Sequence, residues 1–397
     1  MAQGASSFDQ QDHLQVVDAL RGYAILLVIF SHATPYVPQL VWPAKRFFLL
    51  GTYGVQLFFI ASALTLLMSW GRSRDPLGVR SVRFFVRRFF RIAPLYFLAI
   101  PFYWVVKHQV AADFSLETLL ATLFFYNAWS PYLIPTVPGW IAVPGGWSIG
   151  VEFCFYFIFP LLAASVDSLR RALVFFVVAL AIMIAASSFG AALYPEIGSE
   201  ARGTFLYFWP PNQLAIFALG FVLYHAIKSD VLRQRVLRSA ISGNRASAAM
   251  SLIVVALSFY GQHKFFDFSD GTLPTHLLIS LAFTAWALVL VIRSPGLAVN
   301  RLIVKLGQVS FSAYILHFFM LELASRIVSS LWHGPQVGVA SIPYAGAIVL
   351  IGVVLTYLLA AISYRHIEQP FIAIGKRVIA GLRFPGAAVH QGSVPKS

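Results

Sequence analysis

Ten apolar segments, each about 20 residues long, determine what this chain of 397 residues can fold into. A helix of that length crosses a bilayer, and helices satisfy their own backbone polar groups there. The chain is 59% hydrophobic and only 11% charged, which excludes an ordinary soluble domain. We therefore predict an all-α, polytopic membrane protein. The expected spans are residues 15–35, 51–70, 90–108, 147–165, 171–190, 205–227, 246–262, 274–293, 309–331 and 344–364.

The basic residues lie mainly in the loops on one side of these spans. Because loops rich in Lys and Arg stay in the cytoplasm, both termini are predicted to be cytoplasmic. The formal net charge of +14 is then a consequence of topology, and we expect no nucleic-acid partner. We predict a short cytoplasmic tail over 1–13, a transmembrane domain over 14–372, and a disordered cytoplasmic tail over 373–397.

Residues 109–146 do not fit the alternation of spans. The apolar stretch 116–129 is short and is followed by four prolines, so we expect an outward loop with an interfacial or re-entrant helix. An eleventh span is the alternative, but it would place the later basic loops outside. The single cysteine, Cys154, excludes an intramolecular disulfide and a cysteine-cluster metal site. No spacing of His, Cys, Asp and Glu suggests a metal.

The first span contains two ionisable residues, Arg21 and His32. Eleven positions make about three helical turns, so both side chains share one face, roughly 16 Å apart along the axis. An ionisable group at mid-membrane costs about 2.5–3.5 kcal/mol, and such groups usually line a functional path. We expect one continuous cleft with Arg21 nearer the cytosol and His32 nearer the outer face.

Arginines form a stripe before the third span. Arg80, Arg83, Arg87 and Arg91 fall at helical offsets 0, 3, 7 and 11. One interpretation is a stripe that binds anionic membrane lipids, which we favour for Arg80 and Arg83. The other is a phosphate clamp, because guanidinium groups match phosphate oxygens. For Arg88 and Arg91 we favour neither interpretation over the other.

Two later spans carry polar stripes. Ser148, Glu152 and Tyr156 lie one turn apart, and a buried carboxylate is a poor route to stability, so a site role is favoured for Glu152. Pairing with Arg21 or Arg326 is the alternative. The ninth span has a stripe of Ser310, Tyr314 and His317, followed by Glu322 and Arg326 at the spacing of a structural ion pair. A lone histidine such as His317 is more often a satisfied core residue than a catalyst. Gly51 and Gly54, which open the second span, are best interpreted as a packing surface.

Six motifs in this order resemble the membrane-bound acyltransferase 3 family over nearly the whole chain. They are Arg21-x10-His32 preceded by Asp18 and Leu20; Gly51-x-x-Gly54-Val-x-Leu-Phe-Phe-x-x-Ser62; Arg87-Arg88-Phe-Phe-Arg91-Ile-x-Pro94-x-Tyr96; Trp147-Ser148-x-x-Val-Glu152-x-x-Phe-Tyr156-x-x-x-Pro160; Ser310-Phe-Ser-Ala-Tyr314-x-x-His317; and Glu368-x-Pro370-Phe371. The chain departs from the family pattern at Gln56, where many members have Asp, at Ala63, where Gly is usual, and at Cys154, where a Gln follows the Glu.

The resemblance implies a bacterial inner-membrane O-acyltransferase. Its donor would be a cytoplasmic acyl-CoA, with acetyl-CoA expected, and its acceptor a hydroxyl of a glycan, lipid-linked sugar or glycosylated metabolite. On this interpretation Arg87, Arg88 and Arg91 bind the CoA phosphates and Arg21 guides the thioester. His32 acts as general base or forms a transient acyl-imidazole.

Glu152 would orient His32 or the acceptor, and Ser148, Tyr156, Tyr314 and His317 would contact substrate. A transporter or flippase that uses the same residues as a substrate or proton pathway is the alternative, although no inverted repeat is visible. A non-catalytic scaffold would leave Arg21, His32 and Glu152 without a purpose.

Overall fold

A computed structural model describes residues 3–107, 113–133, 140–260 and 274–382. These ranges are helical and contain no strand, only an isolated bridge between Leu40 and Gly338. The first helices are α1 (Gln3–Ala33), α2 (Trp42–Leu49), α3 (Gly54–Trp70), α4 (Leu77–Val106), α5 (Leu116–Leu123), α6 (Gly146–Ser165), α7 (Leu169–Leu193) and α8 (Ser199–Phe208). They are followed by α9 (Pro210–Lys228), α10 (Asp230–Arg238), α11 (Gly243–Tyr260), α12 (Thr275–Arg293), α13 (Arg301–Gln308), α14 (Ser310–Leu331), α15 (Ser341–Ser363) and α16 (Gln369–Gly381). Short helical turns cover Thr34–Tyr36, Leu50–Tyr53, Pro131–Leu133 and, in π form, Tyr364–Glu368.

The prediction of a polytopic all-α membrane protein is confirmed. In the described part of the chain, eight helical segments are long and apolar enough to cross a membrane, and two bent helix pairs bring the total to as many as ten. α8 and α9 meet at 41°, whereas α10 turns away from α11 by 101°. The end of the expected span 246–262 lies outside the described residues.

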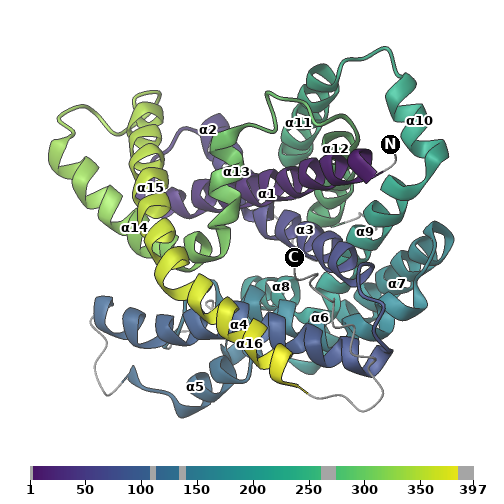
Figure 1. The fold of residues 1–397 in the computed structure, drawn as a ribbon. Helices are drawn as coiled ribbons and strands as arrows, with labels where there is room; N and C mark the ends of the chain where they lie inside the picture. Colours follow the sequence, from purple (N-terminus) through teal and green to yellow (C-terminus); the bar gives the residue numbers. More distant parts are fainter. Residues whose placement is uncertain (1–2, 108–112, 134–139, 261–273, 383–397) are drawn as a thin grey trace, which may run out of the picture.

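Helix α1 runs through the middle of the molecule, with α14 and α15 on one side and α9 on the other (Figure 1). It packs against α3, α13 and α14. The approach to α3 is close because two glycines, Gly51 and Gly54, face α1 there. A Cβ on Gly51 or Gly54 would overlap the carbonyl oxygen of Leu27 or Ala24 in α1. The predicted packing role of these two glycines is confirmed.

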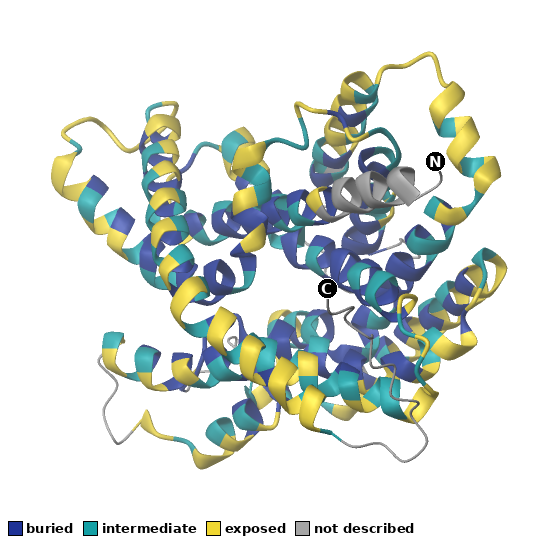
Figure 2. Cartoon of the chain, in the orientation of Figure 1, coloured by how far each residue is buried: buried dark blue, intermediate teal, exposed yellow. Residues whose placement is uncertain are grey.

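Figure 2 shows buried residues concentrated along the central helices and exposed residues on the outer ones. Many of the exposed side chains within candidate spans are large and apolar, among them Phe157, Leu161, Val177 and Leu350. In water such a surface would be a liability, but it suits contact with lipid tails. The core and the lipid-facing surface are therefore both apolar, and polar side chains inside the bundle stand out.

Two expectations at the edges of the domain can be compared with the structure. Helix α5 has eight residues, about 12 Å of rise, which cannot cross a hydrocarbon core of about 30 Å. The prediction of a short helix within 116–129 is confirmed, and an eleventh span there is excluded.

Residues 373–381 of the expected disordered tail instead belong to α16, because Gly375 packs directly on Phe90 of α4. This corrects the start of that tail. Residues 383–397 lie outside the described residues, and the division into domains stays a prediction.

Candidate functional site

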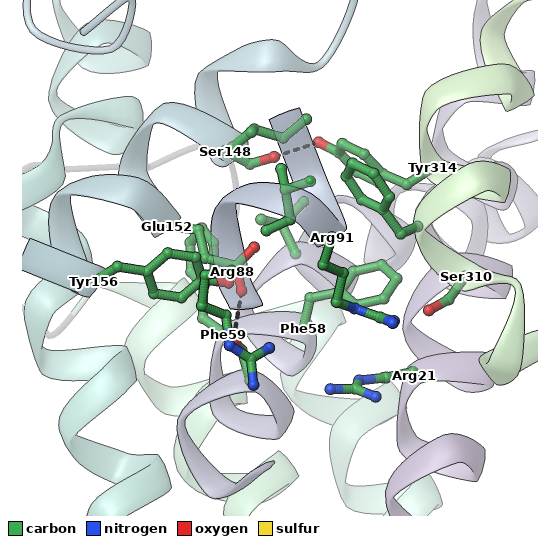
Figure 3. A pocket seen from close by; sticks show the side chains of 15 residues that line it. Arg21, Phe58, Phe59, Arg88, Arg91, Ser148, Glu152, Tyr156, Ser310 and Tyr314 are labelled. Atoms are coloured by element: carbon green, nitrogen blue, oxygen red, sulfur yellow. Dashed lines mark hydrogen bonds between the residues drawn. The ribbon is translucent and has the colours of Figure 1, made fainter. Parts of the chain in front are cut away.

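A cavity of about 680 Å³ lies between α1, α3, α4, α6 and α14. Three guanidinium groups reach it, from Arg21 on α1 and from Arg88 and Arg91 on α4, and they face Glu152 on α6 (Figure 3). We call it the arginine cavity. Three positive charges and one negative charge inside a low-dielectric bundle attract an anion. The cavity suits an anionic ligand better than a neutral one.

Contacts with neighbouring helices hold these arginines in place. Arg21 donates a hydrogen bond of 3.1 Å to Oγ1 of Thr65 on α3 and lies 3.7 Å from the carboxylate of Asp18, one turn earlier. The guanidinium of Arg88 lies 5.9 Å from the ring centres of both Phe84 and Tyr156. Among the described residues, the buried Nε of Arg88 has no hydrogen-bond partner. A buried donor without a protein partner is costly unless a water molecule or a ligand accepts from it.

Glu152 belongs to the arginine cavity. It accepts a hydrogen bond from the hydroxyl of Ser62, and its stripe neighbours Ser148 and Tyr156 line the same cavity. The predicted stripe on one helix face is thus present. The structure does not support the expectation that Glu152 orients His32, because the two residues line different cavities. The role of Glu152 in catalysis stays a prediction.

His32 lines a second cavity of about 1070 Å³ near the opposite end of α1. We call it the histidine cavity. Its described lining carries no Asp, Glu, Lys or Arg; it combines small hydroxyl side chains with aromatic ones. These lining residues include Ser31, Thr34, Thr52, Trp147, Tyr207, Phe208 and Phe318. The cavity suits an uncharged molecule with an apolar face and hydroxyl groups.

A second histidine, His317 on α14, contacts His32 directly. Nε2 of His317 lies 3.2 Å from Nδ1 of His32, and that Nδ1 also lies 3.0 Å from the carbonyl oxygen of Val28. Nδ1 of His317 lies 2.6 Å from the carbonyl oxygen of Tyr314. The sequence alone gave no reason to place the two histidines together, because they are 285 positions apart.

These contacts assign the tautomers of the neutral rings. A ring nitrogen that faces a carbonyl oxygen must carry a hydrogen, so Nδ1 of His317 is protonated and its Nε2 accepts. Nδ1 of His32 then donates to Val28 and His317, and Nε2 of His32 keeps its lone pair. Within the described ranges this Nε2 makes no hydrogen bond to protein. Nε2 of His32 is thus the ring nitrogen left to accept a proton, and the role of His32 as a base stays a prediction.

The two cavities are neighbours. Val55 and Tyr314 line both of them. Arg21 opens only to the arginine cavity and His32 only to the histidine cavity. The side chain of Tyr314 lies where the two cavities adjoin, and a single path that holds both side chains stays a prediction.

Comparison with known proteins decides the family. The model of the acyltransferase 3 family, described as an acyltransferase domain, matches residues 14–361. The chain belongs to this family. "Acyltransferase MdmB" of Streptomyces mycarofaciens is 25% identical over 382 residues, which cover 92% of this chain and 93% of that protein. "Putative membrane-bound transacylase BcsY" of Komagataeibacter xylinus is 25% identical over 399 residues, 97% of this chain and 89% of that protein. No solved structure gives a significant match.

Membership in the acyltransferase 3 family makes the chain a multi-pass membrane acyltransferase. Family membership does not favour the transporter alternative. "Putative O-acetyltransferase SACOL0978" of Staphylococcus aureus (strain COL) is 21% identical over 93% of this chain, but the match covers only 59% of that longer protein. The six motifs that carried the resemblance supply most of the side chains in the arginine cavity and both members of the histidine pair.

The remaining arginines of the stripe lie outside the arginine cavity. Arg87 is exposed, and its role with a cofactor stays a prediction. Arg80 donates to the carbonyls of Trp70 and Ser73, and Arg83 forms a 2.7 Å ion pair with Asp75. Partial burial raises the pKa of Asp75, but hydrogen bonds from Ser73 and Arg83 outweigh it and hold this pKa below its usual value. Both arginines thus stabilise the loop before α4.

Another predicted pair is confirmed at the opposite end of the bundle. Glu322 and Arg326 lie 2.8 Å apart at i, i+4 on α14. Lys107, which directly follows α4, adds a second ion pair to the same carboxylate, at 2.9 Å. These charges tie α14 to α4 and do not reach either cavity.

Sequence reasoning missed several side chains of the site. Thr65 anchors Arg21, and Tyr207 lines the histidine cavity while exchanging hydrogen bonds of 2.8 and 3.0 Å with Gln56. Gln56 also donates to Gln213 at 3.4 Å. Gln56 stands where many relatives have Asp, and its partners show that a neutral amide network replaces a carboxylate. The family departure at Gln56 was the only available signal for this network.

Proposed function

We propose that this acyltransferase moves an acyl group, most simply acetyl, from cytoplasmic acyl-CoA to a hydroxyl of a glycan, lipid-linked sugar or glycosylated metabolite. The observation that carries the proposal is the state of His32. One ring nitrogen is held by Val28 and His317, and the other makes no hydrogen bond to the described residues, on a side chain that lines the histidine cavity. Family membership supports the reaction class.

The arginine cavity would bind the donor. Its excess of positive charge and the unpartnered Nε of Arg88 suit the phosphates and polarised thioester of an acyl-CoA. Arg88 and Arg91 enter from α4, whose start adjoins the predicted cytoplasmic loop 71–76, and Arg21 lies on α1 toward the histidine pair. The donor would therefore enter with its anionic part near α4 and its acyl end directed along α1.

The histidine cavity would bind the acceptor alcohol. Nε2 of His32 removes the hydroxyl proton as the alcohol oxygen attacks the thioester carbonyl carbon. The tetrahedral intermediate then collapses, the carbon–sulfur bond breaks, and the thiolate takes the proton from His32. The products are the ester and free CoA thiol, and the enzyme returns to its starting protonation.

His317 would support this base as a positioning residue. When His32 gains a proton at Nε2, its Nδ1–H still donates to Nε2 of His317, and this hydrogen bond becomes charge-assisted. The ring of His32 also lies against Phe318, with centroids 4.4 Å apart, which limits its rotation. A transient acyl-imidazole on Nε2 is the second route compatible with this geometry.

The test is acyl transfer in membranes that contain the protein. Membranes are incubated with acetyl-CoA labelled in the acetyl group, together with a lipid and glycan extract, and label in the extract is measured. We expect transfer that requires acetyl-CoA, and a loss of about 10²–10⁴-fold in His32→Ala, the usual contribution of a general base. His333→Ala is the matched control, since His333 is exposed in the loop after α14.

Two outcomes would contradict the proposal. Transfer that proceeds equally from a non-CoA acyl donor alone would remove the acyl-CoA assignment. Full transfer by His32→Ala at equal protein level would remove His32 as the base. Solute flux that depends on Arg21 and His32 without any acyl donor would instead support the transporter alternative.

A further inference from the structure

Tyr314 lies at the boundary between the two cavities. Only Val55 and Tyr314 are shared by their described linings, and Tyr314 is the one with a polar group. The side chain comes from α14, one helical turn before His317. It is almost fully buried, and it lines both cavities.

The hydroxyl of Tyr314 is bonded to both sides of this boundary. It lies 2.7 Å from Oγ of Ser148, which lines the arginine cavity (Figure 3). It also donates at 3.0 Å to the carbonyl of Gly145, which lines the histidine cavity. Gly145 has a φ of +74° at the start of α6, and a Cβ there would lie 3.0 Å from the Tyr314 hydroxyl. The turn is thus shaped to receive this hydroxyl.

The ring of Tyr314 is held by aromatic neighbours. Its centroid lies 5.9 Å from Phe58 of α3 in an edge contact and 5.6 Å from the ring of His317. The backbone carbonyl of Tyr314 is the acceptor for Nδ1 of His317. A rotation about χ1 of Tyr314 would therefore open the boundary without changing the backbone contact that fixes the histidine pair.

We propose that the Tyr314 side chain is a partition that decides whether the acyl group is delivered to the acceptor alcohol or lost to water. This inference rests on the proposed function. With the hydroxyl bonded to Ser148 and Gly145, a thioester in the arginine cavity is kept away from Nε2 of His32. Rotation of the side chain removes the barrier, and the carbonyl carbon can then meet an alcohol beside His32.

Opening without an acceptor would have a defined chemical result. A water molecule in the histidine cavity would give its proton to His32 and attack the thioester carbonyl carbon. The carbon–sulfur bond would break, the thiolate would take the proton, and the products would be a carboxylic acid and free CoA thiol. Selectivity for transfer over hydrolysis therefore depends on keeping Tyr314 closed until the acceptor is bound.

The first experiment measures the ratio of acetyl-CoA hydrolysis to transfer. Free CoA thiol is followed without acceptor extract, and label transfer is followed with it. Loss of a hydrogen bond that closes a two-state element shifts its equilibrium by about fivefold, so Tyr314→Phe should raise the ratio by about that factor. Tyr314→Ala removes the barrier itself and should raise the ratio further. In Tyr314→Ala combined with His32→Ala, the extra hydrolysis should disappear.

Tyr103→Phe is the matched control. Tyr103 is also buried, and its hydroxyl also donates to α14, at 2.6 Å to the carbonyl of Ile315. Tyr103 lines neither cavity. Its loss should affect stability in the same way as loss of the Tyr314 hydroxyl, but it should leave the ratio of hydrolysis to transfer unchanged.

The second experiment needs no enzymatic activity. In a Cys154→Ser background, Ile149→Cys places a thiol in the arginine cavity and Thr52→Cys places one in the histidine cavity. A charged thiol reagent is applied to intact cells from outside. Thr52→Cys should react whether or not Tyr314 is present, whereas Ile149→Cys should react only when Tyr314→Ala is added.

Each outcome decides for or against the partition. An unchanged hydrolysis ratio in Tyr314→Ala, or equal outside labelling of Ile149→Cys with and without Tyr314, would overturn it. If the wild type neither transfers acetyl nor releases thiol, the proposed function fails. The labelling pattern would then still show whether Tyr314 separates the cavities.

Discussion

Replacement of His317 gives the sharpest prediction about how the ring of His32, the proposed base, is oriented. His317→Phe keeps an aromatic ring on α14 but removes the nitrogen that accepts from Nδ1 of His32. His317→Gln keeps an acceptor oxygen near the same place. The two variants differ in hydrogen bonding more than in volume, so a comparison between them separates orientation of His32 from packing.

The size of the effect follows from the contacts of His32. A hydrogen bond to a charged group contributes about 1.5–3 kcal/mol, and each 1.36 kcal/mol is a factor of ten in rate, which gives a loss of about 10- to 150-fold. The carbonyl of Val28 remains 3.0 Å from Nδ1 and can still accept its hydrogen. We therefore expect His317→Phe to fall at the lower end of this range, with His317→Gln closer to wild type.

The assay is the initial rate of acetyl transfer at saturating acetyl-CoA and acceptor, normalised to folded protein. The loss should appear in kcat and not in KM for acetyl-CoA, because His317 does not line the arginine cavity. A His317→Phe rate within twofold of wild type would refute the orienting role. Equal losses in both variants would point to packing instead.

Two further predictions concern donor binding and helix packing. Arg88→Ala should raise KM for acetyl-CoA by about 10- to 150-fold, because charge-assisted hydrogen bonds are lost, and it should affect kcat less. The control Arg233→Ala, at an exposed position, should change neither constant. An unchanged KM in Arg88→Ala would place the phosphates elsewhere. Gly51→Ala should destabilise the protein by about 1–3 kcal/mol in thermal unfolding, because its Cβ overlaps the carbonyl of Leu27. Gly346→Ala, with open space around it, should be tolerated, and equal stability of the two variants would contradict the packing argument.

Much of the fold could be predicted because its physical signals are local. Apolar length fixes each span, and the spacing of Ser148, Glu152 and Tyr156 fixes a shared helix face. The spacing of Gly51 and Gly54 predicted a close helix approach, and the structure shows that α1 is the partner. Where prediction failed, the missing information was tertiary: α16 continues past residue 373 because Gly375 finds Phe90, which is far away in the sequence.

The site shows the same limit. Helical periodicity placed Arg21 and His32 on one face but could not show that Tyr314 of another helix lines both of their cavities. It also gave no reason to pair His32 with His317, and it predicted that Glu152 orients either His32 or the acceptor. Which helix packs beside which decides these contacts, and no spacing within one helix carries that information.

The most direct test of the account separates binding from chemistry in the purified protein. Acetyl-CoA affinity and single-turnover acetyl transfer to an acceptor extract are measured for wild type and His32→Ala. We predict that the affinity stays within about twofold, because His32 does not line the arginine cavity, while the transfer rate falls by about 10²–10⁴-fold. A transfer rate near that of wild type, or a loss explained entirely by weaker acetyl-CoA binding, would contradict the role of His32 as the base.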